Sequence, residues 1–103
     1  MNSQKKDTQK LLENSQYAAE MLKGMAHNLR LLMICHIGAE EKSVLELAEY
    51  LGTSQSNVSQ HLAKLRNLGI LNSRRAANQI FYSVKNPEIL ELIKTMQKVF
   101  CRF

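Results

Sequence analysis

The 103-residue sequence predicts one mainly α-helical domain of five helices, with a single β-hairpin between the fourth helix and the fifth. Three observations support this fold class. Apolar residues recur at helical spacing over most of the chain, capping residues and glycines separate these segments, and residues 70–84 alternate as strands do. An apolar fraction of 45% is typical of a globular domain with one core, and we expect no second, catalytic domain.

The first two helices are predicted from apolar periodicity. Leucine, alanine and methionine recur at helical spacing from about Asp7 to Met25, whereas residues 1–6 are polar and are expected to form a flexible tail before a domain of residues 7–103. The segment Ala26-His27-Asn28 interrupts the pattern. A shorter helix follows and stops near Gly38, with Cys35 in or beside its buried face.

The third and fourth helices are joined by a tight turn. Ser43 and Glu46 form a capping-box pattern that starts the third helix, and Gly52 suits the chain reversal that follows it. The fourth helix starts at Thr53 or Ser54, both good N-caps, and ends at Gly69. We call it the reader helix. Its apolar stripe consists of Val58, Leu62 and Leu65.

The hairpin and the last helix complete the domain. Ile70 to Arg75 and Gln79 to Val84 are predicted as two strands joined by a turn at Ala76-Ala77-Asn78. The fifth helix then begins at Asn86-Pro87-Glu88. Asn86 can cap the helix, Pro87 has a φ angle already fixed near the helical value, and Glu88 interacts favourably with the positive end of the helix dipole. The apolar face of this helix is wider than a single contact within a monomer requires.

All of the surplus positive charge lies in one window. Between Glu49 and Glu88 there are five basic residues and no acid, while the rest of the chain balances nine basic residues against nine acidic ones. The reader helix lies in this window and carries small hydrogen-bonding side chains opposite its apolar stripe. A basic field around such a face indicates DNA binding.

The candidate DNA-binding residues combine base-reading and phosphate-binding side chains. Gln and Asn can pair with adenine at two points, serine hydroxyls reach phosphates, and Lys and Arg neutralise them. The alternative is a helix whose polar side is merely solvated. The candidates are Gln55, Ser56, Asn57, Ser59, Gln60 and Lys64 on the helix, and Arg74, Arg75, Asn78 and Gln79 on the hairpin.

The chain resembles the ArsR/SmtB family of repressors from roughly Tyr17 to Cys101. Three segments carry this resemblance: LKGMAHNLRL (22–31), SQSNVSQHLAKLR (54–66) and QIFYSV (79–84). The resemblance implies a winged helix-turn-helix with the hairpin as wing. It also implies a homodimer formed through the first and last helices, which would bind an imperfect palindrome in double-stranded DNA. Gln55, Ser56, Ser59 and Gln60 match the family's usual DNA contacts. Family members often have Pro where this chain has Asn28.

The metal sites of that family are not matched. Ser43 and Leu45 stand where the third helix would carry a Cys-x-Cys pair, and the last helix has Glu88 and Glu91 but no histidine. The three histidines are scattered over three elements. We therefore expect no metal and no other cofactor.

Cys35 and Cys101 are the candidate switch. A lone cysteine on an apolar helix is most often a small core residue. The chain resembles the sulfur- and redox-responsive subgroup that contains the biofilm growth-associated repressor, the sulfide-responsive repressor and HlyU. This resemblance implies that one thiolate attacks a persulfide, polysulfide or peroxide and that the other cysteine captures the modified sulfur. Lys98 and Arg102 flank Cys101, which favours its thiolate and makes Cys35 the resolving partner, although the reverse assignment stays open.

Several function classes are excluded or kept as alternatives. No secretory signal and no apolar run of about 20 residues is present, so we expect a cytoplasmic protein without a membrane partner. No catalytic spacing of Ser, His and Asp and no glycine-rich phosphate loop is present, so we expect no catalytic residues and no enzyme. The remaining alternatives are a metal sensor with a non-standard site, a regulator without effector that acts as an antirepressor, and a helical module that binds an acidic protein.

Overall fold

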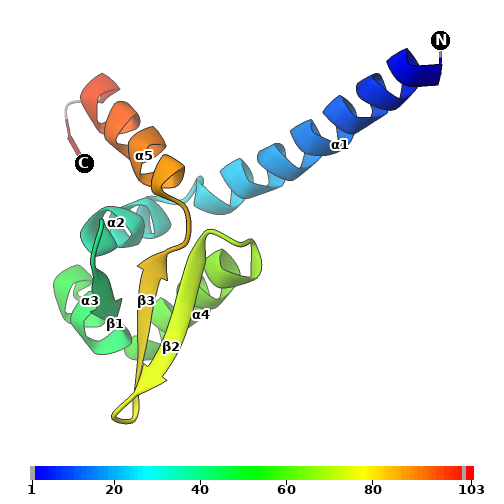
Figure 1. The fold of residues 1–103 in the computed structure, drawn as a ribbon. Helices are drawn as coiled ribbons and strands as arrows, with labels where there is room; N and C mark the ends of the chain where they lie inside the picture. The colour runs from blue at the N-terminus through cyan, green and yellow to red at the C-terminus, as the bar shows by residue number, and fades with distance from the viewer. Residues whose placement is uncertain (1, 101) are drawn as a thin grey trace.

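Five helices and three strands follow one another in the computed structural model, which describes residues 2–100 and 102–103 (Figure 1). Four helices precede a hairpin and a fifth follows it, so the predicted fold class is confirmed. In chain order the elements are α1 (Asn2–Met25), α2 (Asn28–Ile37), β1 (Glu41–Ser43), α3 (Val44–Leu51), α4 (Gln55–Asn67), β2 (Leu71–Ala76), β3 (Gln79–Val84) and α5 (Pro87–Val99).

The sheet contains one strand that the sequence did not predict. Its order is β1-β3-β2, all antiparallel, and the three-residue β1 pairs Glu41 with Ser83 and Ser43 with Phe81. Three residues are too few to show an alternating pattern, and their partners lie far along the chain. The predicted hairpin is confirmed, because Ala77 and Asn78 take positive φ angles of 51° and 64°, as a two-residue hairpin turn requires.

The core lies between α2, α3, α4 and the sheet. The predicted stripe of the reader helix, α4, is fully buried, with Val58, Leu62 and Leu65 all 0% exposed. Burial of each such side chain contributes about 1.5–3 kcal/mol. This stripe fixes which face of α4 looks outward. The other side chains that are at most 1% exposed are Met33, Ile34, Ile37, Ser43, Leu47, Ile70 and Leu71.

Local capping fixes the start of α3 and the turn between α3 and α4. The predicted capping box is present, with Ser43 Oγ accepting from the Glu46 amide and Glu46 Oε1 accepting from the Ser43 amide, both at 3.1 Å. Gly52 is left-handed at φ 67°, and Ser54 caps α4 by accepting from the Asn57 amide. At α5, Asn86 occupies the predicted N-cap position and Pro87 follows it as the first helical residue, although the Asn86 side chain makes no capping hydrogen bond.

The first helix is longer than predicted and stands away from the body (Figure 1). It starts at Asn2 rather than Asp7, so residues 2–6, which were predicted as a tail, continue the helix. Apolar periodicity marks where a helix has a face to bury, not where its backbone begins, and neither Gly nor Pro interrupts residues 2–6. Leu11 and Leu12 are 68% and 58% exposed, so the outer part of the apolar side of α1 has no partner within the described chain. At its inner end, Met25 is buried in the core and Met21 packs against it.

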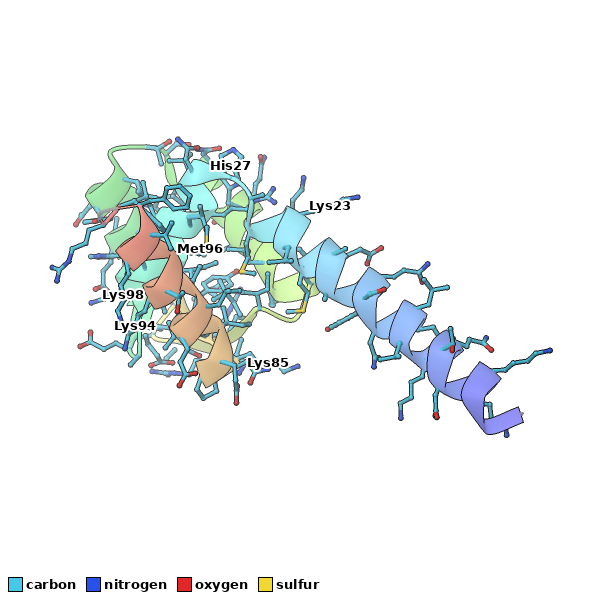
Figure 2. All side chains as sticks on the ribbon, turned by 90° about the horizontal axis from the view of Figure 1, so that it is seen from above. Lys23, His27, Lys85, Lys94, Met96 and Lys98 are labelled. Atoms are coloured by element: carbon cyan, nitrogen blue, oxygen red, sulfur yellow. The ribbon has the colours of Figure 1, made fainter. Side chains whose placement is uncertain are left out.

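An apolar groove runs between α1 and α5. We call it the α1–α5 groove. Figure 2 shows Met96 on the side of α5 toward α1, with Lys94 and Lys98 on the opposite side. The groove is lined by Leu22, Met25, Ala26, Leu31, Leu92, Ile93 and Met96.

Candidate nucleic-acid interface

The reader helix presents its polar arc to solvent, as its sequence predicted. The side chains of Gln55, Ser56, Ser59, Gln60 and Lys64 are exposed, whereas the apolar stripe is buried against the core. Because Gly52 and the Ser54 cap set the angle between α3 and α4, the start of α4 projects with its polar arc free. This is the arrangement that a helix needs to enter a DNA groove.

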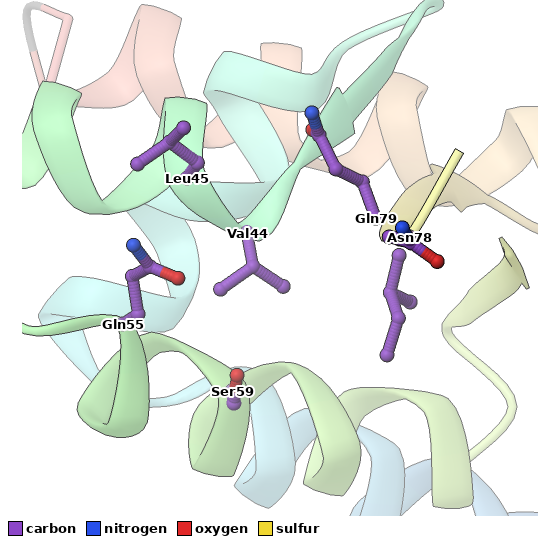
Figure 3. Close-up of a pocket in the computed structure, with 7 residues that line it drawn as sticks. Val44, Leu45, Gln55, Ser59, Asn78 and Gln79 are labelled. Carbon is purple, nitrogen blue, oxygen red and sulfur yellow. The ribbon is translucent and has the colours of Figure 1, made fainter. Parts of the chain in front are cut away.

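A hollow brings the reader helix and the wing together. Gln55 and Ser59 approach it from α4, and Asn78 and Gln79 approach it from the tip of the β2–β3 hairpin (Figure 3). Four of the ten candidate residues, predicted from two separate segments, therefore line one concave surface. Its remaining lining residues are Val44, Leu45 and Ile80.

Leu45 is a candidate that sequence reasoning missed. Its side chain is 42% exposed and lies at the rim of the hollow with the polar side chains of the reader helix (Figure 3). An exposed apolar group at such a surface suits contact with a thymine methyl group. Nothing in the apolar pattern of α3 separates Leu45 from Leu47, which is fully buried.

Asn57 differs from the other candidates on the reader helix. Its side chain is half-buried, and its Nδ2 donates to Thr53 Oγ1 at 3.2 Å, in the turn before the helix. Its amide also donates to the Ser54 cap. These bonds give Asn57 a role in shaping the turn, beside the DNA contact predicted for it.

The basic window of the sequence is not free of acid in space. Arg74 Nε and Nη2 donate to the two carboxylate oxygens of Glu41 at 2.6 and 2.7 Å, and the guanidinium lies 5.0 Å from the centre of the Phe81 ring. The hydrogen bond from Arg74 lowers the pKa of Glu41, and Glu41 in turn raises the pKa of Arg74. The unpredicted strand β1 thus supplies an acid that compensates one of the candidate phosphate-binding cations.

The other cations of the interface keep their charge available. Among the described residues, no carboxylate pairs with Lys64 or Arg75, and Arg66 donates to the Ser73 hydroxyl at 3.3 Å. Lys64 and Arg75 are exposed. They are the cations of this surface that are best placed to neutralise phosphates.

The histidines are not as scattered as the sequence indicated. The rings of His27 and His61 lie 4.6 Å apart, whereas His36 stacks on Tyr50 at 3.7 Å. Within residues 2–100 and 102–103, no three His, Cys, Asp or Glu side chains gather as metal ligands would. The expectation of no metal stays a prediction.

Cys35 lies where α2 meets α5. Its thiol is half-buried, and Gln97 Nε2 of α5 donates to its sulfur at 3.3 Å. Burial raises the pKa of the Cys35 thiol, so a smaller fraction of it is thiolate than in a free cysteine at the same pH. Cys101 lies outside the described residues, so the predicted pairing of the two cysteines stays a prediction.

No helix in the described part of the chain is long and apolar enough to cross a membrane.

Comparison with protein families matches residues 28–73 to the family described as "Bacterial regulatory protein, arsR family". The HTH-type transcriptional regulator YgaV of Escherichia coli is 40% identical over 92 residues, which cover 88% of this chain and 93% of YgaV. The transcriptional activator HlyU of Vibrio cholerae is 38% identical, over 91% of this chain and 87% of HlyU. The biofilm growth-associated repressor of Xylella fastidiosa is 36% identical, over 81% of this chain and 73% of the repressor.

Solved structures of such regulators have the same fold as this chain. The structure of reduced HlyU from Vibrio cholerae matches with a TM-score of 0.81 at 38% identity, over 91% of this chain and 99% of that one. The repressor BigR from Xylella fastidiosa matches with a TM-score of 0.79 at 31% identity, over 93% of this chain and 98% of that one. The names describe transcriptional regulators, both activating and repressing, and not enzymes.

Proposed function

We propose that this chain, which belongs to the ArsR family of bacterial regulatory proteins, binds an imperfect palindromic operator as a homodimer. We also propose that oxidation of Cys35 and Cys101 switches this binding. Membership in the family makes the chain a DNA-binding transcriptional regulator with a winged helix-turn-helix, and not an enzyme. The operator, the dimer, the site residues and the switch belong to the proposal.

The observation that carries the DNA-binding proposal is the hollow between the reader helix and the wing. Three amides, from Gln55, Asn78 and Gln79, line it together with the Ser59 hydroxyl. The exposed cations Lys64 and Arg75 lie on the same helix and the same hairpin. Amides and hydroxyls can form hydrogen bonds with base edges and phosphates. The cations contribute binding affinity that does not depend on the DNA sequence. A dimer would carry two such surfaces, and its symmetry would require a palindromic site.

The proposal is tested by binding to duplex DNA at a series of salt concentrations. Operator fragments are selected from a random duplex pool, and their affinity is followed by fluorescence anisotropy. We expect the affinity to fall steeply with salt, since each neutralised phosphate contributes a slope of about −0.9 in log–log form. Absent or salt-insensitive binding would instead identify a protein-interaction module.

Glu41→Gln provides a sharp variant for the same titration. The substitution removes the acid that holds Arg74, so the guanidinium becomes free to bind phosphate. We expect operator affinity to rise about three- to tenfold at low salt and the salt slope to steepen by about one. Glu49→Gln, on an exposed carboxylate of α3, is the control for removal of an acid in general. Equal effects of the two substitutions would show that Arg74 does not act on DNA.

The α1–α5 groove supports the proposed homodimer. It contains exposed leucines from both helices, Leu22 at 53% and Leu92 at 41%, and apolar patches of this kind are typical of subunit interfaces. The outer half of α1 adds Leu11 and Leu12, which nothing in the described chain covers. A second copy that offers the same two helices would cover both surfaces by twofold symmetry.

The proposed switch is a two-electron oxidation of two thiols. The Cys101 thiolate attacks the outer sulfur of a persulfide RSSH, RS⁻ leaves, and Cys101 becomes a persulfide. The Cys35 sulfur, after loss of its proton, then attacks the inner sulfur of Cys101 and expels HS⁻, which leaves a disulfide between the two cysteines. The oxidant is reduced to a thiol and hydrosulfide. A peroxide would act through a sulfenic acid and release water.

Two observations support these roles. The raised pKa of Cys35 suits a resolving thiol better than an attacking one. The hydrogen bond from Gln97, four residues before Cys101 in the chain, brings α5 to the Cys35 sulfur. Gln97 also lines a hollow with Phe103 and the three cations Lys94, Lys98 and Arg102. The positive charge of this surface would favour an anionic oxidant.

Cys35→Ser is expected to bind the operator with unchanged affinity and to lose its response to oxidants. The substitution keeps the size of the side chain but removes the resolving sulfur, so no bridge can form. Intact mass spectrometry after treatment with persulfide, peroxide or diamide is read beside operator affinity at fixed salt. Loss of DNA binding in the reduced variant would identify Cys35 as a core residue, and an unchanged response would remove it from the switch.

A further inference from the structure

We propose that His27, Arg30 and His61 form a proton-sensitive joint that holds the reader helix to the turn between α1 and α2, and that protonation of His61 opens this joint and weakens operator binding. The inference rests on the proposed function, because its readout is operator affinity. It adds a form of control that acts on the reader helix directly and involves neither cysteine.

Arg30 is the centre of the joint. Its Nη1 donates to the carbonyl of Gly24, in the last turn of α1, at 2.9 Å, and its Nε donates to His61 Nδ1 on the reader helix at 3.1 Å. One side chain of α2 therefore connects α1 to α4. Because α1 borders the proposed dimer groove, Arg30 lies between the surface that joins two copies and the helix that reads DNA.

Both histidines act as acceptors through Nδ1. His61 accepts from Arg30, and His27 Nδ1 accepts from the Leu29 amide at 3.2 Å, which caps the start of α2. A neutral imidazole can accept at one nitrogen, whereas an imidazolium has donors at both and accepts at neither. Protonation of His61 therefore breaks the hydrogen bond from Arg30 that holds the reader helix to α2.

The charges around His61 oppose its protonation. His27 from the turn, Arg30 from α2 and Lys64 from the reader helix itself act on His61, and no acid is among them. Partial burial is the largest cause that lowers the pKa of His61, followed by these three groups. Neutral His61 is thus the form that the fold favours.

The position of His61 separates this joint from the DNA surface. On the reader helix, His61 follows Gln60 by one residue, about 100° further round the helix, and its ring packs on His27 rather than standing in solvent. The ring is therefore directed at the α1–α2 turn. Its protonation acts on DNA through the placement of α4 and not through a contact with a phosphate.

The sign of the pH effect follows from linkage. The pKa of His61 is lower in the folded chain than the usual value of about 6.5, so the unfolded chain binds more protons. The stabilisation is complete above about pH 6.5 and declines as the pH falls through the folded pKa. Thermal stability and operator affinity should decline together in acid.

The test is operator affinity at fixed ionic strength between about pH 7.5 and about pH 5.5. For the wild-type chain we expect affinity to fall about three- to tenfold across this range, because each proton that must be released changes affinity by up to tenfold per pH unit. H61Q keeps an oxygen acceptor for Arg30 but cannot titrate, and it should lose most of this dependence. The double variant H27N/H61Q, which removes both rings of the joint, should depend on pH no more than H61Q does, and H36Q, on the histidine that stacks on Tyr50, should follow the wild type.

The opposite outcomes are distinct. A rise in affinity at low pH would mean that the new charge acts directly on phosphates, and the same profile in wild type and H27N/H61Q would remove the joint; either result overturns the inference. If the wild type binds no DNA at pH 7.5, the proposed function fails, and the joint is then judged by thermal stability against pH in the same variants.

A measurement on the wild-type chain covers the case in which a variant fails to fold. Long-range ¹H–¹⁵N correlation spectra distinguish the two neutral tautomers of each imidazole. The joint requires the proton of His61 on Nε2, with Nδ1 as acceptor. A proton on Nδ1 at neutral pH would overturn the inference.

Discussion

Leu92→Glu is expected to convert the proposed dimer to a monomer and to reduce operator affinity by on the order of 10²- to 10³-fold, because the second half-site would no longer bind as part of the same molecule. The substitution places a charge in the apolar α1–α5 groove, where it would be buried without a partner in the dimer. Analytical ultracentrifugation gives the oligomeric state, and anisotropy on the full palindrome gives the affinity.

The control for this prediction lies on the same helix. Lys94→Glu introduces the same side chain on the opposite side of α5, outside the groove (Figure 2). It should remain dimeric and keep its affinity within a few-fold. A dimeric Leu92→Glu chain with normal affinity would show that the groove is not the interface, and the exposed leucines of the outer half of α1 would become the next place to search.

Gln60→Ala is expected to weaken binding to the selected operator by about 1–3 kcal/mol for each half-site and to relax the base preference at one position in each half. Gln60 is exposed on the polar arc of the reader helix, and among the described residues none forms a hydrogen bond with its side chain. The fold therefore loses little when the side chain is shortened, and the loss appears in DNA binding.

Asn67→Ala is the matched control for Gln60→Ala, because Asn67 is an exposed amide at the far end of the same helix. Binding to the operator and to unrelated duplex DNA is compared at one salt concentration. We expect Gln60→Ala to lose specific affinity while its non-specific affinity stays nearly unchanged. An equal loss on both kinds of DNA would mean that Gln60 contacts the backbone instead of a base.

Much of the reader helix could be predicted because its signals are local. The capping box at Ser43 and Glu46, the left-handed Gly52 and the stripe of Val58, Leu62 and Leu65 each involve residues at most a few turns apart. Steric and hydrogen-bonding preferences over such spans act almost independently of the rest of the chain. Element boundaries were less secure, as the start of α1 at Asn2 shows.

The chemistry of the wing could not be predicted in the same way. Arg74 was one of five cations in a window without acids, yet its carboxylate partner, Glu41, lies 33 residues earlier in the chain. The strand that carries Glu41 has three residues, and it exists because β3 offers it a free edge. A charge count along the sequence therefore overstates the number of cations that are free to bind DNA.

What the sequence by itself determined is the order of the helices, the hairpin, the polar arc of the reader helix and the family, since all of these follow from short-range patterns. The tertiary structure decided which side chains meet: Glu41 with Arg74, Arg30 with His61 across 31 residues, and Leu45 with the polar hollow. The physical reason is that a hydrogen bond between elements, or the exposure of a face, depends on how the elements pack. Local periodicity carries no information about which residues of distant elements come into contact.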